Sequence, residues 1–316
     1  MKKNKPILAL GLTPALQRTL RFERFQPGEV NRAKEVTVSA AGKCVNVGLA
    51  LATLGDEAFV TGFNGGSAGR MLVADVVKRG ARPAFTRIDA ETRTCTTVID
   101  DATGDVTELV QEAPAVSDDD LARLTRKLLR LLPSCAAMTI SGNLPKTFPA
   151  DSYAPFARKA ESLGIPWLID SHKAPLLSAL PFHPRLAKLN RKELAATFGG
   201  KDDCEQDRLN NLRKLTEAGA RWALMTDGAR PSLLVSADGD FFRLEPAALD
   251  KVASPIGSGD CTAAGIIHGL LHGLDMVDAV AYGLACGTAN AQTYIPAFFN
   301  KPTEKKGRTS PSKKSK

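Results

Sequence analysis

The sequence predicts an α/β protein with a doubly wound, mostly parallel sheet, helices on both faces and a small β-sheet lid. Short apolar runs of strand length alternate with longer segments of helical periodicity. Two half-polar, β-rich stretches interrupt this alternation. The chain of 316 residues is 43% hydrophobic and 24% charged, which is typical of a folded protein.

Six apolar runs are the expected strands of the main sheet: residues 7–12, 58–63, 136–141, 166–170, 186–190 and 222–226. Four segments between them have helical spacing: residues 43–55, 67–80, 117–131 and 209–218. The third begins at Ser117, a good N-cap followed by three aspartates, and ends before Pro133. Strand–helix–strand alternation at this spacing favours parallel strands.

Residues 18–40 and 85–111 do not follow the alternation. They contain short half-polar strand patterns, and the segment Asp101-Ala-Thr-Gly104 is typical of a hairpin turn. We interpret them as a separate small sheet that forms a lid on a domain spanning residues 6–299. The alternative is that they are edge strands of the main sheet.

The net charge of +8 is concentrated at the two ends of the chain. Lys2, Lys3 and Lys5 contribute +3 and residues 300–316 contribute +6, which leaves −1 for residues 6–299. We expect residues 300–316, rich in Lys, Ser and Pro, to be a disordered basic tail. A basic tail alone does not indicate a nucleic-acid-binding domain.

Composition excludes several other classes. No apolar run reaches the roughly 18 residues of a membrane span. The six cysteines include no Cys-x-x-Cys pair, which argues against a disulfide scaffold or zinc ribbon and favours a reducing, cytoplasmic location. His268 and His272 are four residues apart, but no acid lies between them, so we expect structural or surface roles.

The strongest local motif is Ile256-Gly-Ser-Gly-Asp260, a small-residue loop that leads into an apolar helix. Backbone N–H groups at a helix N-terminus attract anions, so this loop could hold a phosphate group. Asp260 lies in the first helical turn and is a candidate general base, which the helix dipole would keep ionised. The alternative is simple N-capping, because this sequence also begins helices well.

Three further segments carry candidate ligands. Lys43 and Asn46 lie on one face of a helix start and suit a polyol or a phosphate. Asn190 and Glu193 follow a strand and could hold Mg²⁺ through water, or form a capping box. Arg93 has the planar guanidinium that suits a phosphate monoester. Each segment could also be an ordinary helix start or a solvated cation.

In their order along the chain these motifs resemble those of the ribokinase-like, PfkB-type carbohydrate kinases, and especially the 1-phosphofructokinase and tagatose-6-phosphate kinase branch. The resemblance covers about residues 6–299. Seven motifs carry it: Gly11-Leu-Thr-Pro-Ala15, Pro27-Gly-Glu-Val-Asn-Arg-Ala33, Ala41-Gly-Lys-Cys-Val-Asn46, Glu91-Thr-Arg93, Ser141-Gly-Asn-Leu-Pro145, Lys188-Leu-Asn-Arg-Lys-Glu-Leu194 and Ile256-Gly-Ser-Gly-Asp260. Members of the family carry a small sheet over the sugar site that often pairs between subunits, which implies a homodimer through the lid.

The resemblance implies ATP-dependent phosphoryl transfer to a hydroxyl of fructose-1-phosphate, fructose-6-phosphate or tagatose-6-phosphate, with Mg²⁺ bridging the phosphates of ATP. Asp260 would take the proton from the sugar hydroxyl. The other implied roles are charge stabilisation by Gly257, Ser258 and Gly259; sugar-phosphate binding by Gln17, Gly42, Lys43, Asn46 and Arg93; nucleotide binding by Lys188, Asn190, Thr226, Gly228 and Asn290; and metal binding through water by Asn190 and Glu193.

The sequence departs from the family pattern mainly in the sugar-binding half. Gln17 stands where the family usually has an aspartate that hydrogen-bonds sugar hydroxyls. Cys44 replaces a glycine, and Cys95 stands where the branch often has a small polar residue. Two alternatives therefore stay open: a kinase of a different sugar or nucleoside, and a degenerate, non-catalytic sugar-binding relative. The retained Asp260 argues against the second.

Overall fold

Nine strands form the main sheet of the computed structural model, which describes residues 5–199 and 204–302. They are β1 (Ile7–Leu10), β4 (Ala58–Thr61), β6 (Arg82–Pro83), β10 (Ala137–Ser141), β11 (Trp167–Asp170), β12 (Leu186–Asn190), β13 (Trp222–Asp227), β14 (Arg230–Ser236) and β15 (Phe241–Leu244). Their order is β15-β14-β13-β12-β11-β10-β1-β4-β6, and only the pairs made by β14 are antiparallel. The predicted mostly parallel sheet is therefore confirmed.

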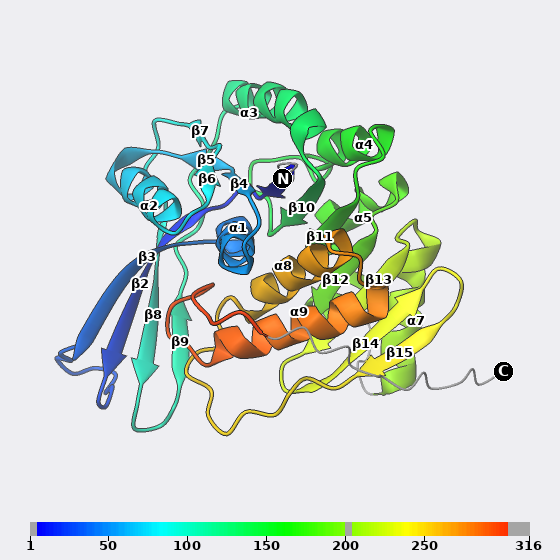
Figure 1. The fold of residues 1–316 in the computed structure, drawn as a ribbon. Coiled ribbons are helices and arrows are strands. Elements are labelled where there is room, and N and C mark those ends of the chain that lie inside the picture. Colours follow the sequence, from blue (N-terminus) through cyan, green and yellow to red (C-terminus); the bar gives the residue numbers. More distant parts are fainter. Residues whose placement is uncertain (1–4, 200–203, 303–316) are drawn as a thin grey trace.

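Helices cover both faces of this sheet (Figure 1). One face carries α1 (Lys43–Leu54), α2 (Gly66–Lys78), α8 (Ser258–Leu271) and α9 (Met276–Ala291). The other carries α3 (Asp118–Leu131), α4 (Ala154–Ser162), α5 (Lys173–Leu177), α6 (Arg191–Phe198) and α7 (Glu205–Glu217), with short 3₁₀ turns at Leu132–Ser134 and Leu180–Phe182. Because both faces are buried, β1 is apolar throughout: Ile7 packs into one core and Leu8 into the other.

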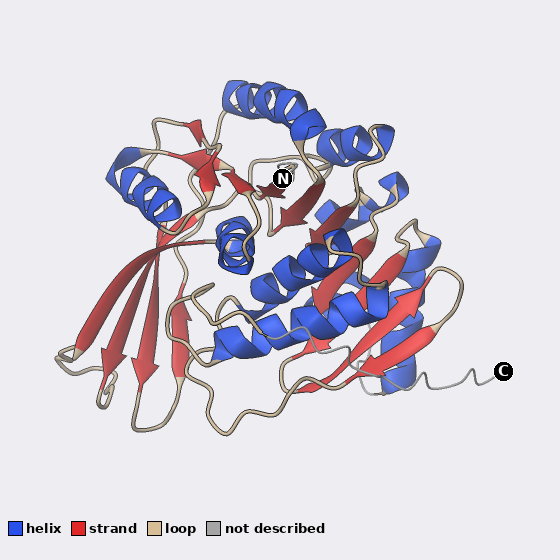
Figure 2. Ribbon diagram, viewed as in Figure 1, coloured by secondary structure: helices blue, strands red, loops and turns tan. Residues whose placement is uncertain are grey.

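The two half-polar stretches form a separate four-stranded sheet, as predicted, which projects to one side of the main domain (Figure 2). Its strands are β2 (Ala15–Phe22), β3 (Glu35–Ala41), β8 (Thr94–Asp100) and β9 (Val106–Leu109), in the order β3-β2-β8-β9. A two-stranded element, β5 (Phe63–Asn64) and β7 (Thr86–Arg87), lies outside both larger sheets. We call the four-stranded sheet the lid.

Helices α8 and α9 pack closely against each other. A Cβ atom on Gly283 of α9 would lie 2.5 Å from the carbonyl oxygen of Thr262 on α8, so no larger residue fits there without moving a helix. Such an approach fixes the position of α8, whose first turn carries the Gly-Ser-Gly-Asp motif.

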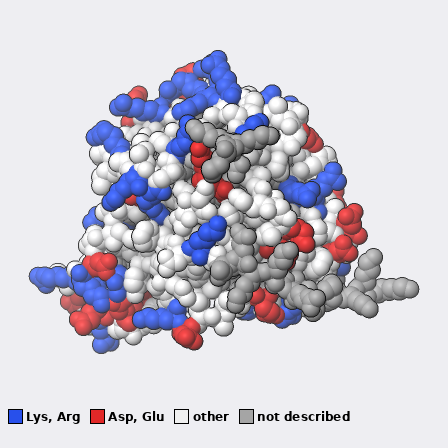
Figure 3. Space-filling model, viewed as in Figure 1, with Lys and Arg blue, Asp and Glu red and all other residues white. Residues whose placement is uncertain are grey.

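Positive and negative side chains are interspersed over the face shown in Figure 3, in agreement with the near-neutral charge calculated for residues 6–299. None of the helices in the described ranges is both long and apolar enough to span a membrane. The expected disordered tail spans residues 300–316, and residues 303–316 of it lie outside the described residues.

Candidate active site

A cavity of about 510 Å³ lies where the lid meets the carboxyl ends of β12 and β13. Ligands of doubly wound sheets bind at this edge. Residues from eight separate segments line it, and they include nearly all of the sequence-predicted site residues: Gln17, Gly42, Lys43, Asn46, Arg93, Lys188, Asn190, Glu193, Thr226, Gly228, Gly257, Ser258, Gly259 and Asp260. Asn290, the remaining predicted residue, is not among the lining residues.

Asp260 lies in the first turn of α8 and is 7% exposed. Its Oδ2 accepts a hydrogen bond from Asn46 Nδ2 at 2.7 Å. Burial and then the charge of Asp170 raise the pKa of Asp260 to about 7, although Lys43 and the Asn46 bond act in the opposite direction. The sequence predicts an ionised carboxylate, and burial brings the pKa of this group close to neutrality. A carboxyl group near neutrality is well matched to proton abstraction.

The backbone at the start of α8 offers N–H donors to the cavity. Gly257 has φ +81°, a left-handed conformation that favours glycine, and its Cβ would meet Pro296 at 2.9 Å. The Ser258 N–H donates to the Pro255 carbonyl at 3.2 Å, so this predicted charge-stabilising amide is already engaged. The amides of Gly259 and Asp260 have no acceptor among the described residues. Unpaired N–H groups at a helix start can bind an anion.

A buried ion network crosses the floor of the cavity. Asp170, 3% exposed at the end of β11, accepts Lys43 Nζ at 2.7 Å and Lys188 Nζ at 2.5 Å. Lys43 also contacts Glu193 at 2.9 Å. Burial opposes the charged forms, but the pairing is stronger: it lowers the pKa of Asp170 and raises the pKa of Lys43. Lys43 is therefore a fixed cation whose position Asp170 and Glu193 define.

The lid and the residues beside it form the side of the cavity that is expected to bind the sugar. Gln17 is buried on β2, and its Nε2 donates to Thr97 Oγ1 at 2.7 Å. The Arg93 guanidinium donates to the carbonyls of Thr13 (2.7 Å) and Gln111 (3.2 Å), so it joins the start of β2 to the end of the lid and also lines the cavity. Glu108 of β9 lines the same rim, where burial raises its pKa more than Arg93 lowers it.

The two cysteines that depart from the family pattern occupy different environments. Cys44 is 2% exposed, with its Sγ 3.4 Å from the Thr61 carbonyl and 3.6 Å from the Gly11 carbonyl. Burial raises the pKa of the Cys44 thiol to about 12, and the residue does not line the cavity. Cys95 does line it. Of the two, Cys95 is placed to contact a ligand.

Asn290 requires a correction to its expected role, because it is fully buried behind the cavity wall. Its Nδ2 donates to the Ile256 carbonyl at 2.8 Å and to Ser258 Oγ at 3.1 Å, while its Oδ1 accepts from the Ala297 N–H at 2.8 Å. Both donor hydrogens of its Nδ2 and its Oδ1 acceptor are thus used in hydrogen bonds to other protein groups. Asn290 therefore positions the loop before α8 rather than contacting a nucleotide.

The family model for pfkB family carbohydrate kinases matches residues 7–303. The chain belongs to this family. It is a sugar kinase, as the order of the seven motifs predicts.

Solved structures with the same fold agree with this assignment. A Staphylococcus aureus protein, provisionally assigned as a phosphofructokinase, has a TM-score of 0.73 and 26% identity over 91% of this chain and 92% of that chain. Escherichia coli phosphofructokinase-2, in a tetrameric inhibited form, has a TM-score of 0.83 and 24% identity over 90% and 94%. A Thermotoga maritima protein, provisionally assigned as a 1-phosphofructokinase, has a TM-score of 0.84 and 23% identity over 93% of each chain.

An apolar slot of about 220 Å³ adjoins the cavity of this carbohydrate kinase and shares Thr226, Gly228 and Ser258 with it. Its walls come from the segment before α8 and from α9, with lining residues that include Pro246, Leu249, Val252, Leu284 and Thr288. An apolar slot beside a phosphate-binding helix start suits a nucleobase. Sequence reasoning missed Pro246, Leu249 and Val252 because residues 245–257 have no periodic pattern.

Asn190 and Glu193 form the capping box of α6: Asn190 Oδ1 accepts the Glu193 N–H, and Glu193 Oε2 accepts the Asn190 N–H, both at 2.9 Å. The two alternatives weighed for this motif are compatible, because both residues of the capping box also line the cavity. Oxygen donors of this kind fit Mg²⁺ bound through its waters.

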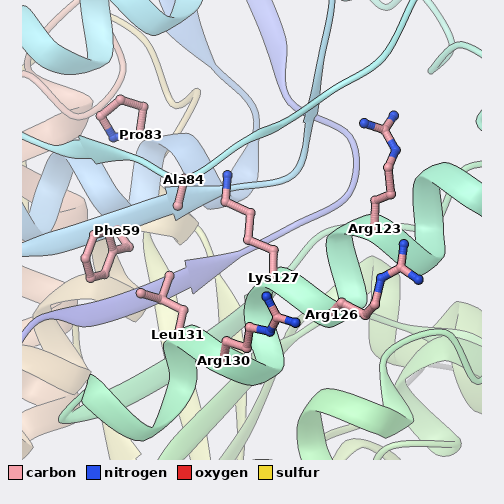
Figure 4. A pocket seen from close by; sticks show the side chains of 8 residues that line it. All are labelled: Phe59, Pro83, Ala84, Arg123, Arg126, Lys127, Arg130 and Leu131. Atoms are coloured by element: carbon pink, nitrogen blue, oxygen red, sulfur yellow. The ribbon is translucent and has the colours of Figure 1, made fainter.

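A second cavity, of about 590 Å³, lies between the edge strand β6 and helix α3 (Figure 4). Its lining contains four cations and no acid: Arg123, Arg126, Lys127, Arg130, Phe59, Pro83, Ala84 and Leu131. Lys127 donates to the Phe85 carbonyl at 2.6 Å, and Arg123 pairs with Asp120. With no general base in its lining, this cavity is not suited to the kinase reaction.

Proposed function

We propose that this kinase transfers the γ-phosphoryl group of ATP to a hydroxyl of a phosphorylated ketohexose, with Asp260 as the general base. The observation that carries the proposal is a buried carboxyl group with a pKa of about 7, placed at a helix N-terminus in a cavity that also contains Lys43 and Arg93. Fructose-1-phosphate, fructose-6-phosphate and tagatose-6-phosphate are the candidate acceptors. Escherichia coli phosphofructokinase-2, which shares the fold, has a structure in complex with fructose-6-phosphate.

In the proposed reaction, Asp260 accepts the proton of the acceptor hydroxyl while the hydroxyl oxygen forms a bond to the γ-phosphorus. The bond between that phosphorus and the β–γ bridging oxygen breaks, and ADP leaves. The free amides of Gly259 and Asp260 stabilise the charge on the transferring group. Asn190 and Glu193 would hold Mg²⁺ through its waters, and the ion would neutralise charge on the phosphates. The adjoining apolar slot holds the adenine.

Asn46 provides a second contact for the acceptor. Its Nδ2 is used by Asp260, and its Oδ1 is buried without a hydrogen-bond partner among the described residues. Buried acceptors in native proteins are nearly always paired, so this oxygen is suited to receive a sugar hydroxyl proton. The hydroxyl would then lie next to the base.

One observation favours a second candidate, a kinase of an unphosphorylated sugar. The cavity lining holds three cations, Lys43, Arg93 and Lys188, against four acidic side chains, among them Glu108 on the lid. Lys43 is already paired with two of these acids. A cavity with at least as many acidic as basic side chains can bind the hydroxyl groups of a free sugar as well as a phosphate group.

A coupled ATP-consumption assay over free and phosphorylated ketohexoses, pentoses and nucleosides distinguishes the candidates. We expect the highest kcat/KM with a ketohexose phosphate, and a loss of about 10²–10⁴-fold in kcat for Asp260→Asn. Higher kcat/KM with a free sugar would support the second candidate. Turnover that survives Asp260→Asn would refute the mechanism, and no turnover on any acceptor would favour the non-catalytic relative.

A further inference from the structure

Asp56, His268 and His272 converge at the ends of α1 and α8 that are remote from the cavity. Both helices begin at the cavity, with Lys43 and Ser258, and extend about 20 Å away from it. Asp56 Oδ2 lies 2.7 Å from His268 Nδ1, and Asp56 Oδ1 lies 3.9 Å from His272 Nε2. One donor atom from each of the three residues lies within 4.8 Å of the other two.

The orientation of His272 leaves one nitrogen available. Its Nδ1 lies 2.8 Å from the His268 carbonyl oxygen, which can only accept, so Nδ1 carries the proton. In the neutral ring, the Nε2 atom, which is nearest to Asp56, is the one with a free lone pair. A histidine whose other ring nitrogen donates to a carbonyl is the usual arrangement of a metal ligand.

Burial distinguishes the cluster from an ordinary surface contact. The side chain of His268 is 3% exposed and that of Asp56 is 10% exposed, whereas that of His272 is 41% exposed. His268 Nε2 has no hydrogen-bond partner among the described residues. The contact with Asp56 alone therefore does not satisfy this buried ring, and His272 keeps the cluster open to solvent.

The electrostatic environment favours a cation. Asp56 brings a negative charge, and His272 is the C-cap of α8, where the last carbonyls give the helix end a partial negative charge. The α1 helix also ends here, at Gly55. Within the described residues, no Lys or Arg side chain pairs with Asp56.

We propose that Asp56, His268 and His272 bind one divalent transition-metal ion, such as Zn²⁺ or Co²⁺, that links the end of α1 to the end of α8. Two imidazoles and one carboxylate are typical ligands of these metals rather than of Mg²⁺ or Ca²⁺. Tetrahedral ligand atoms lie roughly 3.3 Å apart, so the observed separations require shifts of about an ångström. Water completes the coordination from the solvent side.

Co²⁺ absorption and the thermal midpoint in Zn²⁺ test the site on the full chain. The informative variant is His272→Gln, because His272 is exposed and its loss creates no cavity. The matched control is His183→Gln: His183 is likewise exposed and lies 2.6 Å from the carboxylate of Glu161. Both measurements are made without nucleotide or sugar, so their outcome does not depend on the proposed kinase substrate.

We expect one Co²⁺ per chain, with visible tetrahedral bands, and an increase in the thermal midpoint in micromolar Zn²⁺. His272→Gln should weaken Co²⁺ binding at least tenfold and abolish the increase, while His183→Gln leaves both unchanged. Asp56→Asn should weaken binding similarly. The proposal fails if the unmodified chain binds no Co²⁺, or if His272→Gln binds it as tightly as His183→Gln does.

Discussion

At the scale of single residues, the environment of Asp260 links its proposed role as general base to the stability of the fold. Its pKa rises from an ordinary value of 3.8 to about 7 on folding, mainly through burial. The folded protein therefore holds this proton more tightly than the unfolded chain does. The stabilising contribution is complete below the unfolded pKa and is lost as the pH rises through about 7.

This linkage gives the first prediction. The kcat/KM of the free enzyme should fall as the pH drops below about 7, because the base becomes protonated.

The Asp260→Asn variant removes the buried charge and keeps the shape of the side chain. At pH 8 it should therefore be more stable than the unmodified chain by at least about 1 kcal/mol, with a smaller difference at pH 5. Urea unfolding at both pH values measures it. An Asn variant less stable at pH 8 would contradict the assigned environment.

The second prediction concerns Glu108, which faces the cavity beside Arg93. If the substrate is phosphorylated, Glu108→Gln removes a repelling charge and should lower the KM of the sugar roughly two- to fivefold with little change in kcat. Glu112→Gln, at an exposed position outside the cavity lining, is the control. A raised KM would show that Glu108 binds a hydroxyl and would favour the unphosphorylated acceptor.

Residue types and their order were sufficient to select most of the side chains that line the cavity. The roles of Asp170 and Asn290 could not be read in the same way. Asp170 acts through Lys43, 127 positions away in the chain, and Asn290 through the Ile256 carbonyl. Such partners are defined by packing, which local spacing does not encode. The same applies to Asp56: no acid lies between His268 and His272 in the sequence, and packing brings Asp56 to them from the end of α1.

At the scale of elements, the predicted strand at residues 186–190 has the observed bounds, and α3 has the predicted N-cap at Ser117, to which the structure adds a capping box with Asp120. Buried apolar runs and caps are local signals, so these elements were predictable. The antiparallel β14 and β15 were not predicted as members of the main sheet. Neither was the part of the apolar slot that residues 246–255 form, because this segment has no regular structure.

The third prediction concerns the attachment of α9 to the loop before α8. Asn290→Ala leaves the Ile256 carbonyl and the Ala297 N–H without their buried partner and should cost about 1–3 kcal/mol of stability. As the loop loosens, we expect kcat to fall and the KM for ATP to rise, although Asn290 does not line the cavity. Asn210→Ala on the exposed face of α7 is the control. Unchanged kinetics in a less stable variant would limit Asn290 to a structural role.

At the scale of the whole molecule, the lid presents exposed apolar side chains on its two edge strands and just beyond them. Val36 and Val38 on β3 are 52% and 43% exposed, and Leu109 and Val110 are 57% and 59% exposed. We propose that a second copy of the chain covers part of this surface, as the family resemblance implies. Edge strands left uncovered invite pairing with another chain.

The fourth prediction tests this assembly. The double variant Val36→Lys, Val38→Lys should sediment as a monomer where the unmodified chain sediments as a dimer. Its KM for the sugar should also rise, because the lid carries Gln17 and Arg93 lies at its edge. Val77→Lys, an equally exposed apolar position on α2, should leave the dimer intact. A monomeric unmodified chain would contradict the proposed dimer.

The close approach of α9 to α8 at Gly283 has a consequence for how the protein can diverge. The base and the amides beside it belong to a helix pair that leaves almost no room for substitution, whereas Gln17, Cys95 and Glu108 lie on a peripheral sheet. Mutations can therefore accumulate in the lid without disturbing the transfer chemistry. Selection for a new acceptor would act on the lid, and the phosphoryl-transfer half would be inherited almost unchanged.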